Sequence, residues 1–277
     1  MTWFDPTAEV RGRALVALMI SDPAAKCAAV DALVDAWHAG HLALANTFQC
    51  PPIVVPGRPV RPELVAATSV PRRNAHTAEG HAALVHAIAH IEFNAINLAL
   101  DCVARFGCAG ASFVSDWLRV AHEEAGHYRM LSARLGELGY RYGDFTAHNG
   151  LWDMAVQTAS DFLARMALVP RLLEARGLDA TPPIQAKLRT IGDQPTLAIL
   201  DVILHDEMGH VSIGDRWYRQ ACAAAGRDPE AYFLTLIERF RASPPRPPMN
   251  RDARLAAGFS AAELDGFEAL AAQAAAH

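Results

Sequence analysis

HEEAGH at residues 122–127 returns as HDEMGH at residues 205–210. Both stretches read His, an acidic residue, Glu, any residue, Gly and His. Each lies in a long segment whose apolar residues recur at helical spacing, so we expect both to lie on helices. Two copies of one pattern in a single chain indicate an internal repeat.

An isolated glutamate precedes each copy of the motif on an earlier predicted helix. Glu92 precedes Glu124, and Glu174 precedes Glu207, at separations that differ by a single position. The interval from Glu92 to Glu174 likewise matches the interval from Glu124 to Glu207 to within one position. This agreement indicates a duplicated pair of helices, in which one helix supplies a glutamate and the next supplies the motif.

The spacing inside the motif is suited to metal ligands. Glu124 and His127 are three residues apart, as are Glu207 and His210, and residues at this spacing lie only about 60° apart around a helix, so both can reach one point. A zinc-protease motif needs two histidines four residues apart on one face. The two histidines of each copy here are five residues apart, which excludes that alternative.

The faces that carry these glutamates are apolar. The residues at helical spacing around them are Trp117, Val120, Ala121 and Leu131 for Glu124, Leu200, Ile203, Leu204 and Val211 for Glu207, and Val85, Ile88, Ala95, Ile96 and Ala99 for Glu92. A carboxylate on such a face points into the core, where an isolated charge costs several kcal/mol. Two divalent cations would offset four buried carboxylates, with two neutral imidazoles completing the ligand shells.

One Glu from each of two helices and Glu-x-x-His from each of two others is the ligand pattern of di-iron and di-manganese carboxylate proteins. We therefore predict a site for two metal ions, with iron as the first choice and manganese as the second, since Glu and His ligands accept both. The predicted ligands are Glu92, Glu124, His127, Glu174, Glu207 and His210.

The two predicted helix pairs are not equally regular. Glu92 precedes Gly107 by nearly the same number of positions as Glu124 follows Gly110, so both are expected about 21–23 Å from the same turn. In the second pair, the prolines at 182–183 are expected to break the chain between the two helices. Glu174 should consequently lie near the end of its helix.

The whole chain is expected to be all-α, a ferritin-like four-helix bundle with additional N- and C-terminal helices. We expect a single structural domain in which residues 1–75 are N-terminal helices and a proline-rich crossing segment packed on the bundle, 76–226 are the bundle and 227–277 are a helical extension. The last helix, 261–275, is expected to pack outside the bundle or to be loosely ordered. Pro170 is expected to bend its helix or remove one hydrogen bond. The predicted helices are 7–20, 23–45, 76–106, 112–138, 151–176, 184–191, 194–225, 228–242 and 261–275.

The composition of the chain indicates which binding partners and which cellular compartment to expect. The 277-residue chain has a formal charge of −5 and a pI of about 6.2, which gives no basic face for nucleic acid. Its five cysteines include no CxxC pair and are expected to be reduced. No apolar run approaches a membrane span, and ALVALMI at residues 14–20 is assigned to an ordinary helix rather than a signal peptide. A cytoplasmic protein is expected.

Several other polar residues allow a functional and a structural interpretation. His122 and His205 can support the ligands or bond between helices, and His86 and His90 can line an entrance to the metals or make a contact between helices or subunits. Tyr128 can be a redox group or a packed aromatic. Three aspartates can orient a metal-bound imidazole or serve as surface and capping residues: Asp101, Asp161 and Asp201.

The chain resembles a bacterial ferritin-like family classed as a domain of unknown function (DUF455). The resemblance spans about residues 14–240, and it implies the ferritin-like fold and the same six ligands. A more distant similarity links the chain to ferritin-like tRNA hydroxylases, oxygen-using di-iron enzymes, although the acidic composition argues against an RNA substrate. Four passages carry the resemblance: HAIAHIEFNAINLALD (86–101), HEEAGHYRMLSARLGELGY (122–140), RLLEARGLDATPP (171–183) and ILHDEMGHVSIGDRWY (203–218).

The expected function is a non-haem di-iron, or iron–manganese, oxidase or oxygenase that uses O2 on a small-molecule substrate. Glu124 and Glu207 would bridge the metals, and the other four ligands would be terminal. The first alternative is a ferroxidase or metal-handling protein without an organic substrate, and the second is a metal site that only stabilises the fold. Storage of iron would require a many-subunit cage, whereas a homodimer is the candidate assembly for an enzyme. The electron donor is open.

Overall fold

The computed structural model describes residues 9–45 and 47–275, which contain helices and no strand. The class is all-α, as predicted. Two isolated backbone bridges, between Glu9 and Ala43 and between Leu64 and Ala147, are the extended pairings in these residues. The chain divides into two compact units between Val156 and Gln157, inside the segment predicted as the bundle. The two are described in turn as the N-terminal unit and the C-terminal unit.

The N-terminal unit is built on two long helices. The predicted helix from residue 7 starts two residues before the described part of the chain. The elements are α1 (Val10–Leu18), α2 (Pro23–His38), η1 (Ala67–Ser69), α3 (Ala78–Phe106), η2 (Gly107–Ala109), α4 (Ala111–Glu137) and α5 (Gly150–Gln157), the last of which ends at the boundary.

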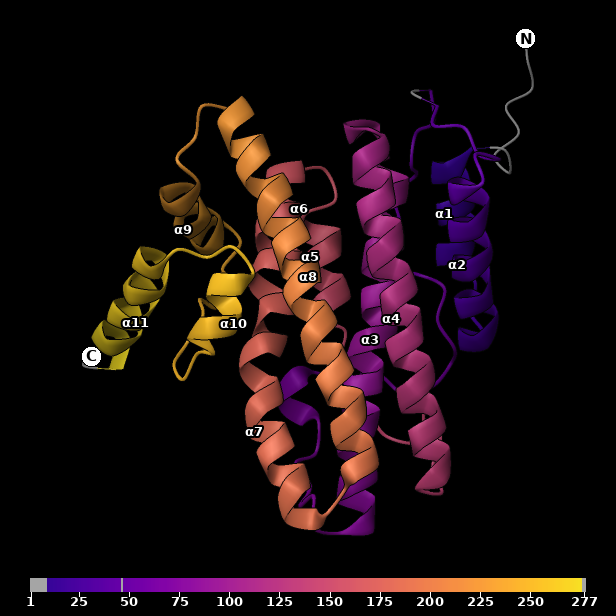
Figure 1. Ribbon diagram of the computed structural model, residues 1–277, viewed down its shortest axis with the longest axis vertical. Helices are drawn as coiled ribbons and strands as arrows, with labels where there is room; N and C mark the ends of the chain where they lie inside the picture. Colours follow the sequence, from indigo (N-terminus) through magenta and orange to yellow (C-terminus); the bar gives the residue numbers. More distant parts are fainter. Residues whose placement is uncertain (1–8, 46, 276–277) are drawn as a thin grey trace. The chain divides into compact units, whose positions relative to one another are not determined.

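Helices α3 and α4 form a tightly packed hairpin (Figure 1). Thr77 caps the start of α3 by accepting from the backbone N–H of Gly80. The connection after η2 passes through Gly110 at φ 121°, a conformation that favours glycine. Most of α3 is buried, whereas α4 buries one face.

The N-terminal helices pack on this hairpin, α1 against α3 and α2 against α4. The fully buried Lys26 fixes this packing, because its ammonium donates to the backbone carbonyls of Leu18 (2.7 Å) and Gly57 (2.8 Å) and to the side chain of Asn97 on α3. One lysine thus ties α1, α2, the crossing segment and α3 together.

The C-terminal unit contains a long helical run that faces a second long helix. Its elements are α6 (Phe162–Leu168), η3 (Val169–Glu174, a π-helical turn), α7 (Ala175–Ile191), α8 (Gln194–Ala224), α9 (Pro229–Arg239), α10 (Arg251–Ala256) and α11 (Ala261–Ala275). The first three are continuous with one another, and each of them packs against α8 (Figure 1). Helix α10 was not predicted.

Two predicted boundaries in this unit are wrong. The helix expected over 151–176 stops at Gln157, and a new one starts after Asp161, whose side chain caps the N–H of Ala164. The break expected at Pro182 and Pro183 does not occur, because α7 continues through both.

The helix tolerates Pro182 because a distant side chain replaces the missing hydrogen bond. Pro182 has no N–H to donate to the carbonyl of Leu178, four residues earlier. That carbonyl instead accepts from the side-chain amide of Asn250, at 3.2 Å. The backbone N–H of Asn250 also donates to Asp179, at 2.9 Å, which holds the donor in place.

One segment is apolar enough to pass a composition test for a membrane span. An apolar stretch within residues 78–109 has a mean hydropathy of 1.3, contrary to the expectation from the sequence. However, 78% of that stretch is buried inside the structure. The segment comprises α3 and η2, and its apolar side chains are those of a buried core helix. All five cysteines are free thiols, as predicted, and Cys27, Cys102 and Cys222 are buried.

Candidate metal centre

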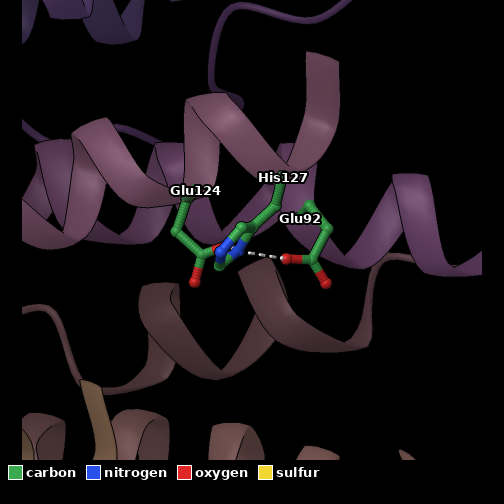
Figure 2. A group of neighbouring side chains, drawn as sticks. All are labelled: Glu92, Glu124 and His127. Atoms are coloured by element: carbon green, nitrogen blue, oxygen red, sulfur yellow. Dashed lines mark hydrogen bonds and ion pairs between the residues drawn. The ribbon is translucent and has the colours of Figure 1, made fainter. Parts of the chain in front are cut away.

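Three of the predicted ligands meet in the N-terminal unit. Glu92 projects from α3, and Glu124 and His127 project from α4, where all three are at most 2% exposed. Figure 2 shows the imidazole of His127 between the two carboxylates. His127 Nδ1 lies 3.0 Å from Glu92 Oε2 and 3.3 Å from Glu124 Oε2. One ligand atom from each residue lies within 4.8 Å of the other two, so the three can hold a metal ion.

The packing of α4 aims these side chains inward. Trp117, Ala121 and Leu131, on the same face as Glu124, are fully buried. Tyr128, the residue after His127, packs its ring against Phe93 of α3 at a centroid distance of 5.5 Å. Tyr128 is therefore a packed aromatic side chain, as its structural interpretation proposed. The apolar surroundings keep water from the carboxylates.

The electrostatics of this trio favour a bound positive charge. Burial raises the pKa of Glu92 to about 8, and the neighbouring Glu124 carboxylate acts in the same direction. Burial opposes charge on His127, but its hydrogen bonds to Glu124 and Glu92 outweigh that effect and raise its pKa to about 12. The site thus holds protons strongly, and a metal ion would bind by displacing them.

The other three predicted ligands are buried in the C-terminal unit. Glu174 is the last residue of η3, and Glu207 and His210 lie three residues apart on α8. The exposed fractions are 8% for Glu174, 6% for Glu207 and 0% for His210. Since each of these groups is polar and buried, this unit repeats the composition of the first trio.

The start of α7 lies close to the Glu207 carboxyl group. A Cβ atom added to Gly177 would lie 4.0 Å from Cδ of Glu207, an ordinary contact distance. Gly177 is three residues after Glu174, so the helix that carries Glu174 faces Glu207. Among the described residues, Glu174 belongs to no trio with ligand atoms within 4.8 Å. The prediction of Glu174 as a ligand is neither confirmed nor excluded by this geometry.

His122 and the three aspartates singled out in the sequence make structural contacts. His122 Nδ1 lies 3.0 Å from Asp31 Oδ1 on α2, which is a bond between helices. Three aspartates contact groups other than imidazoles: Asp101 accepts from Arg105, Asp161 caps α6, and Asp201 accepts from Gln185.

His86 and His90 fasten a loop to α3. The backbone N–H of Gly143 donates to His86 Nε2 at 2.9 Å, and the hydroxyl of Tyr142 lies 2.8 Å from His90 Nδ1. Burial lowers the pKa of both histidines to about 4, so both are neutral at pH 7. The role of this pair is a contact within the chain.

Sequence reasoning missed a buried ionic cluster beside Glu174. Arg171 is fully buried and contacts Asp215 of α8 and Glu263 of α11. Arg171 and Glu263 are far apart along the chain, and Glu263 lies outside the four passages that carry the resemblance. No local pattern in the sequence pairs them.

Comparisons with known proteins agree with the resemblance read from the sequence. The family model described as "Protein of unknown function (DUF455)" matches residues 19–265. An uncharacterised protein of Haemophilus influenzae (strain ATCC 51907 / DSM 11121 / KW20 / Rd) is 47% identical over 260 residues, which cover 90% of each chain. No solved structure matches. The chain therefore belongs to the DUF455 family of proteins of unknown function.

Proposed function

We propose that the six side chains of the two buried sets bind two metal ions, and that the protein is a di-iron or iron–manganese carboxylate enzyme of ferritin-like fold. Its activity would be that of an O2-dependent oxidase or oxygenase on a small organic substrate in the cytoplasm. The observation that carries the proposal is the trio Glu92, Glu124 and His127, buried, with ligand atoms within 4.8 Å of one another.

The donor set fits two divalent cations. Each unit supplies two carboxylates and one imidazole, all at most 8% exposed. Buried carboxylates without compensating charge would cost several kcal/mol each, and two divalent cations balance four of them. Glutamate and histidine ligands without any thiolate are suited to iron and manganese rather than to copper(I) or to a thiolate-bound zinc site.

The bound metals would supply the chemistry with dioxygen. The residues of the chain would fix coordination and surroundings. Glu124 and Glu207 hold equivalent places in the two copies of the motif. They would hold the metals together with Glu92, Glu174, His127 and His210. The apolar stripe around Glu124 would keep bulk water from the reacting groups.

Anaerobic loading with ferrous iron tests the proposal directly. We expect about two iron atoms per chain, because two divalent cations balance the four buried carboxylates, and oxygen uptake when air is admitted. Glu124→Ala should remove the metal and the oxygen uptake while the far-UV helical signal remains. Glu123→Ala is the matched control, because the neighbouring Glu123 pairs with Arg119 on the outside of α4.

The outcomes separate the proposal from its alternatives. Iron uptake that is unchanged in Glu124→Ala would contradict the metal site itself. Two bound irons without oxygen uptake would leave a structural site. Oxygen uptake that stops once added iron is oxidised, in a large multi-subunit assembly, would instead indicate a ferroxidase or storage protein. Continued turnover in a monomer or dimer with an added reductant would support the enzyme.

A further inference from the structure

Glu174 is the last residue of the π-helical turn η3, whose backbone departs from regular α-helical geometry. The backbone N–H of Ala175 reaches the carbonyl of Pro170, five residues earlier, instead of four. Pro170 itself contributes no N–H. Such turns insert one residue into a helix and persist where the surrounding structure enforces them. The question is therefore which contacts of the C-terminal unit enforce this one.

Helix α8 holds the first part of the turn by close contact. A Cβ atom added to Gly214 of α8 would lie 2.4 Å from Cβ and 2.5 Å from Cγ of Pro170, so only glycine permits the observed approach. Gly214 follows His210 by one helical turn and Glu207 by two, on the same face of α8. The contact with Pro170 thereby sets how near η3 lies to the helix that carries the motif.

Arg171 holds the turn from inside the unit. The Nε atom of Arg171 donates to Asp215 Oδ1 at 2.7 Å, and one of its terminal nitrogens donates to Glu263 of α11. Its guanidinium lies 4.3 Å from the ring centre of Phe233 and 4.5 Å from that of Phe259. Since Arg171 is fully buried, these contacts leave it little freedom to rotate.

Helix α11 presents Glu263 in a fixed position. The backbone N–H of Ser260 donates to Glu263 Oε2 at 2.9 Å, and the Ser260 hydroxyl accepts from the N–H of Glu263 at 3.0 Å. Arg219 of α8 also donates to Glu263 and to Asp215, at 2.8 Å in each case. The carboxylate is therefore tied to its own helix and to α8 before it meets Arg171.

We infer that Arg171 is a positioning residue, clamped by Asp215 and by Glu263 of the C-terminal helix, which holds the π-turn and so aims the carboxylate of Glu174. This inference rests on the proposed function, in which Glu174 is a metal ligand. Relaxation of η3 to a regular α-helix would remove the inserted residue, which rotates Glu174 by about 100° relative to the preceding helix. A rotation of that size takes the carboxylate off the face that meets Glu207.

A contribution to folding stability does not by itself explain the buried ionic cluster around Arg171. A buried ion pair is often no more stabilising than apolar side chains of the same volume, because desolvation opposes the attraction of the charges. A planar guanidinium that donates through two of its nitrogens to two different carboxylates, by contrast, is fixed in direction as well as in distance. The cluster lies three residues from Glu174, where direction would decide whether the carboxylate reaches a metal.

Two glutamine substitutions on α11 separate positioning from stability. Glu263→Gln keeps an oxygen for Ser260 but removes the charge that faces Arg171. Glu268→Gln is the matched control, because Glu268 lies on the same helix but pairs with the half-exposed Arg251 of α10. Arg171→Lys is the second test variant, because it keeps the charge and loses the planar fork.

Two readouts on the full-length protein decide the matter. The first is hydrogen exchange of peptides that cover residues 169–175 in metal-free protein. It should be faster in Glu263→Gln and Arg171→Lys than in the wild type, and unchanged in Glu268→Gln, while far-UV spectra stay alike. The second is titration with Co²⁺ alone, where we expect the two test variants to bind one of the two ions about ten- to hundredfold more weakly, as for other supports of metal ligands.

A double substitution assigns the loss to Glu174. If Arg171 acts through that carboxylate, Glu263→Gln should weaken Co²⁺ binding in the wild type and have no further effect in Glu174→Gln. Equal exchange in the turn, or equal losses in the Glu263→Gln and Glu268→Gln proteins, would overturn the inference. Absence of Co²⁺ and Fe²⁺ binding in the wild type would instead overturn the proposed function, with the exchange data still deciding whether the clamp holds the turn.

Discussion

The two units carry the same pattern of buried glutamate and histidine side chains on helix pairs that are built differently. In the N-terminal unit, Glu92 and Glu124 lie within the unbroken helices α3 and α4, which a short turn joins. In the C-terminal unit, Glu174 ends a π-turn, and the helix that follows contains Pro182 and Pro183. The regular pair needs only helix geometry to bring its ligands level.

The irregular pair depends on groups far along the chain. Asn250 supplies the hydrogen bond that Pro182 cannot, and Glu263 clamps Arg171 beside Glu174. Both come from the C-terminal extension, whose last helix was expected to be loosely ordered or outside the bundle. The comparison shows that side chains of this extension hold the irregular helix pair.

The largest expected effect is on metal binding by the equivalent glutamates. Glu92→Gln and Glu174→Gln each remove one carboxylate from one set, and we expect losses beyond the roughly hundredfold that substitution of a supporting residue causes. Metal content after gel filtration measures this. If Glu174→Gln keeps full metal content while Glu92→Gln loses it, the second set does not contain Glu174.

Alanine at two glycines should affect the two units in opposite directions. Gly214→Ala forces Pro170 away from α8, so we expect destabilisation of about 1–3 kcal/mol, typical of overpacking. Gly126→Ala lies on α4 with no atom within 4 Å of the added Cβ, and should stabilise the protein by up to about 1 kcal/mol through helix propensity. Urea unfolding measures both, and a tolerant Gly214 would show that η3 is not pressed against α8.

The contribution of Glu92 and His127 to the stability of metal-free protein should fall as pH rises from about 5 to 8. The pKa of Glu92 in the folded state is raised to about 8, and that of His127 to about 12, so these two groups bind more protons in the folded state than in the unfolded one across this range. Their contribution is complete at low pH and is lost on raising the pH, whereas the lowered pKa values of His86 and His90 act in the opposite direction. Thermal unfolding of the wild type and of Glu92→Gln at pH 5.5 and 8 isolates the contribution: the wild type should lose stability relative to the variant as the pH is raised, and a constant difference between the two proteins would contradict this.

The smallest effect concerns the proline helix. Asn250→Ser keeps a capping oxygen for α10 but loses the amide that bonds to Leu178, and should cost about 1 kcal/mol. In a Pro182→Ala background, a backbone N–H becomes available to that carbonyl, so the same substitution should cost less. Equal costs in the two backgrounds, measured by urea unfolding, would remove Asn250 from its assigned role.

The parts of the molecule that could be predicted are those determined by the spacing of residues close together in the sequence. Helical spacing predicted α3, α4 and α8, and the repeat of Glu-x-x-His predicted the trio that meets in the N-terminal unit. The level heights of Glu92 and Glu124 followed from rise per residue alone. The one-residue insertion at η3 and the uninterrupted helix through Pro182 were missed, because each depends on a partner dozens of residues away.

The contacts between a loop and α3 were not predicted from the sequence for the same reason. Tyr142 and Gly143 lie in an irregular segment with no periodicity, yet they meet His90 and His86 of α3. In the sequence, nothing distinguishes Arg171 from a surface arginine. The contact with Glu263 is seen only in the structure. Sequence patterns report which face of a helix is buried, but they do not report which distant charge a buried arginine will meet.

Anomalous diffraction at the iron edge from crystals grown with ferrous iron is the most direct measurement. The proposal predicts two peaks within one chain, together coordinated by Glu92, Glu124, His127, Glu174, Glu207 and His210. Peaks bound by other residues, or one ion held by Glu92, Glu124 and His127 with the remaining three side chains turned away, would contradict it.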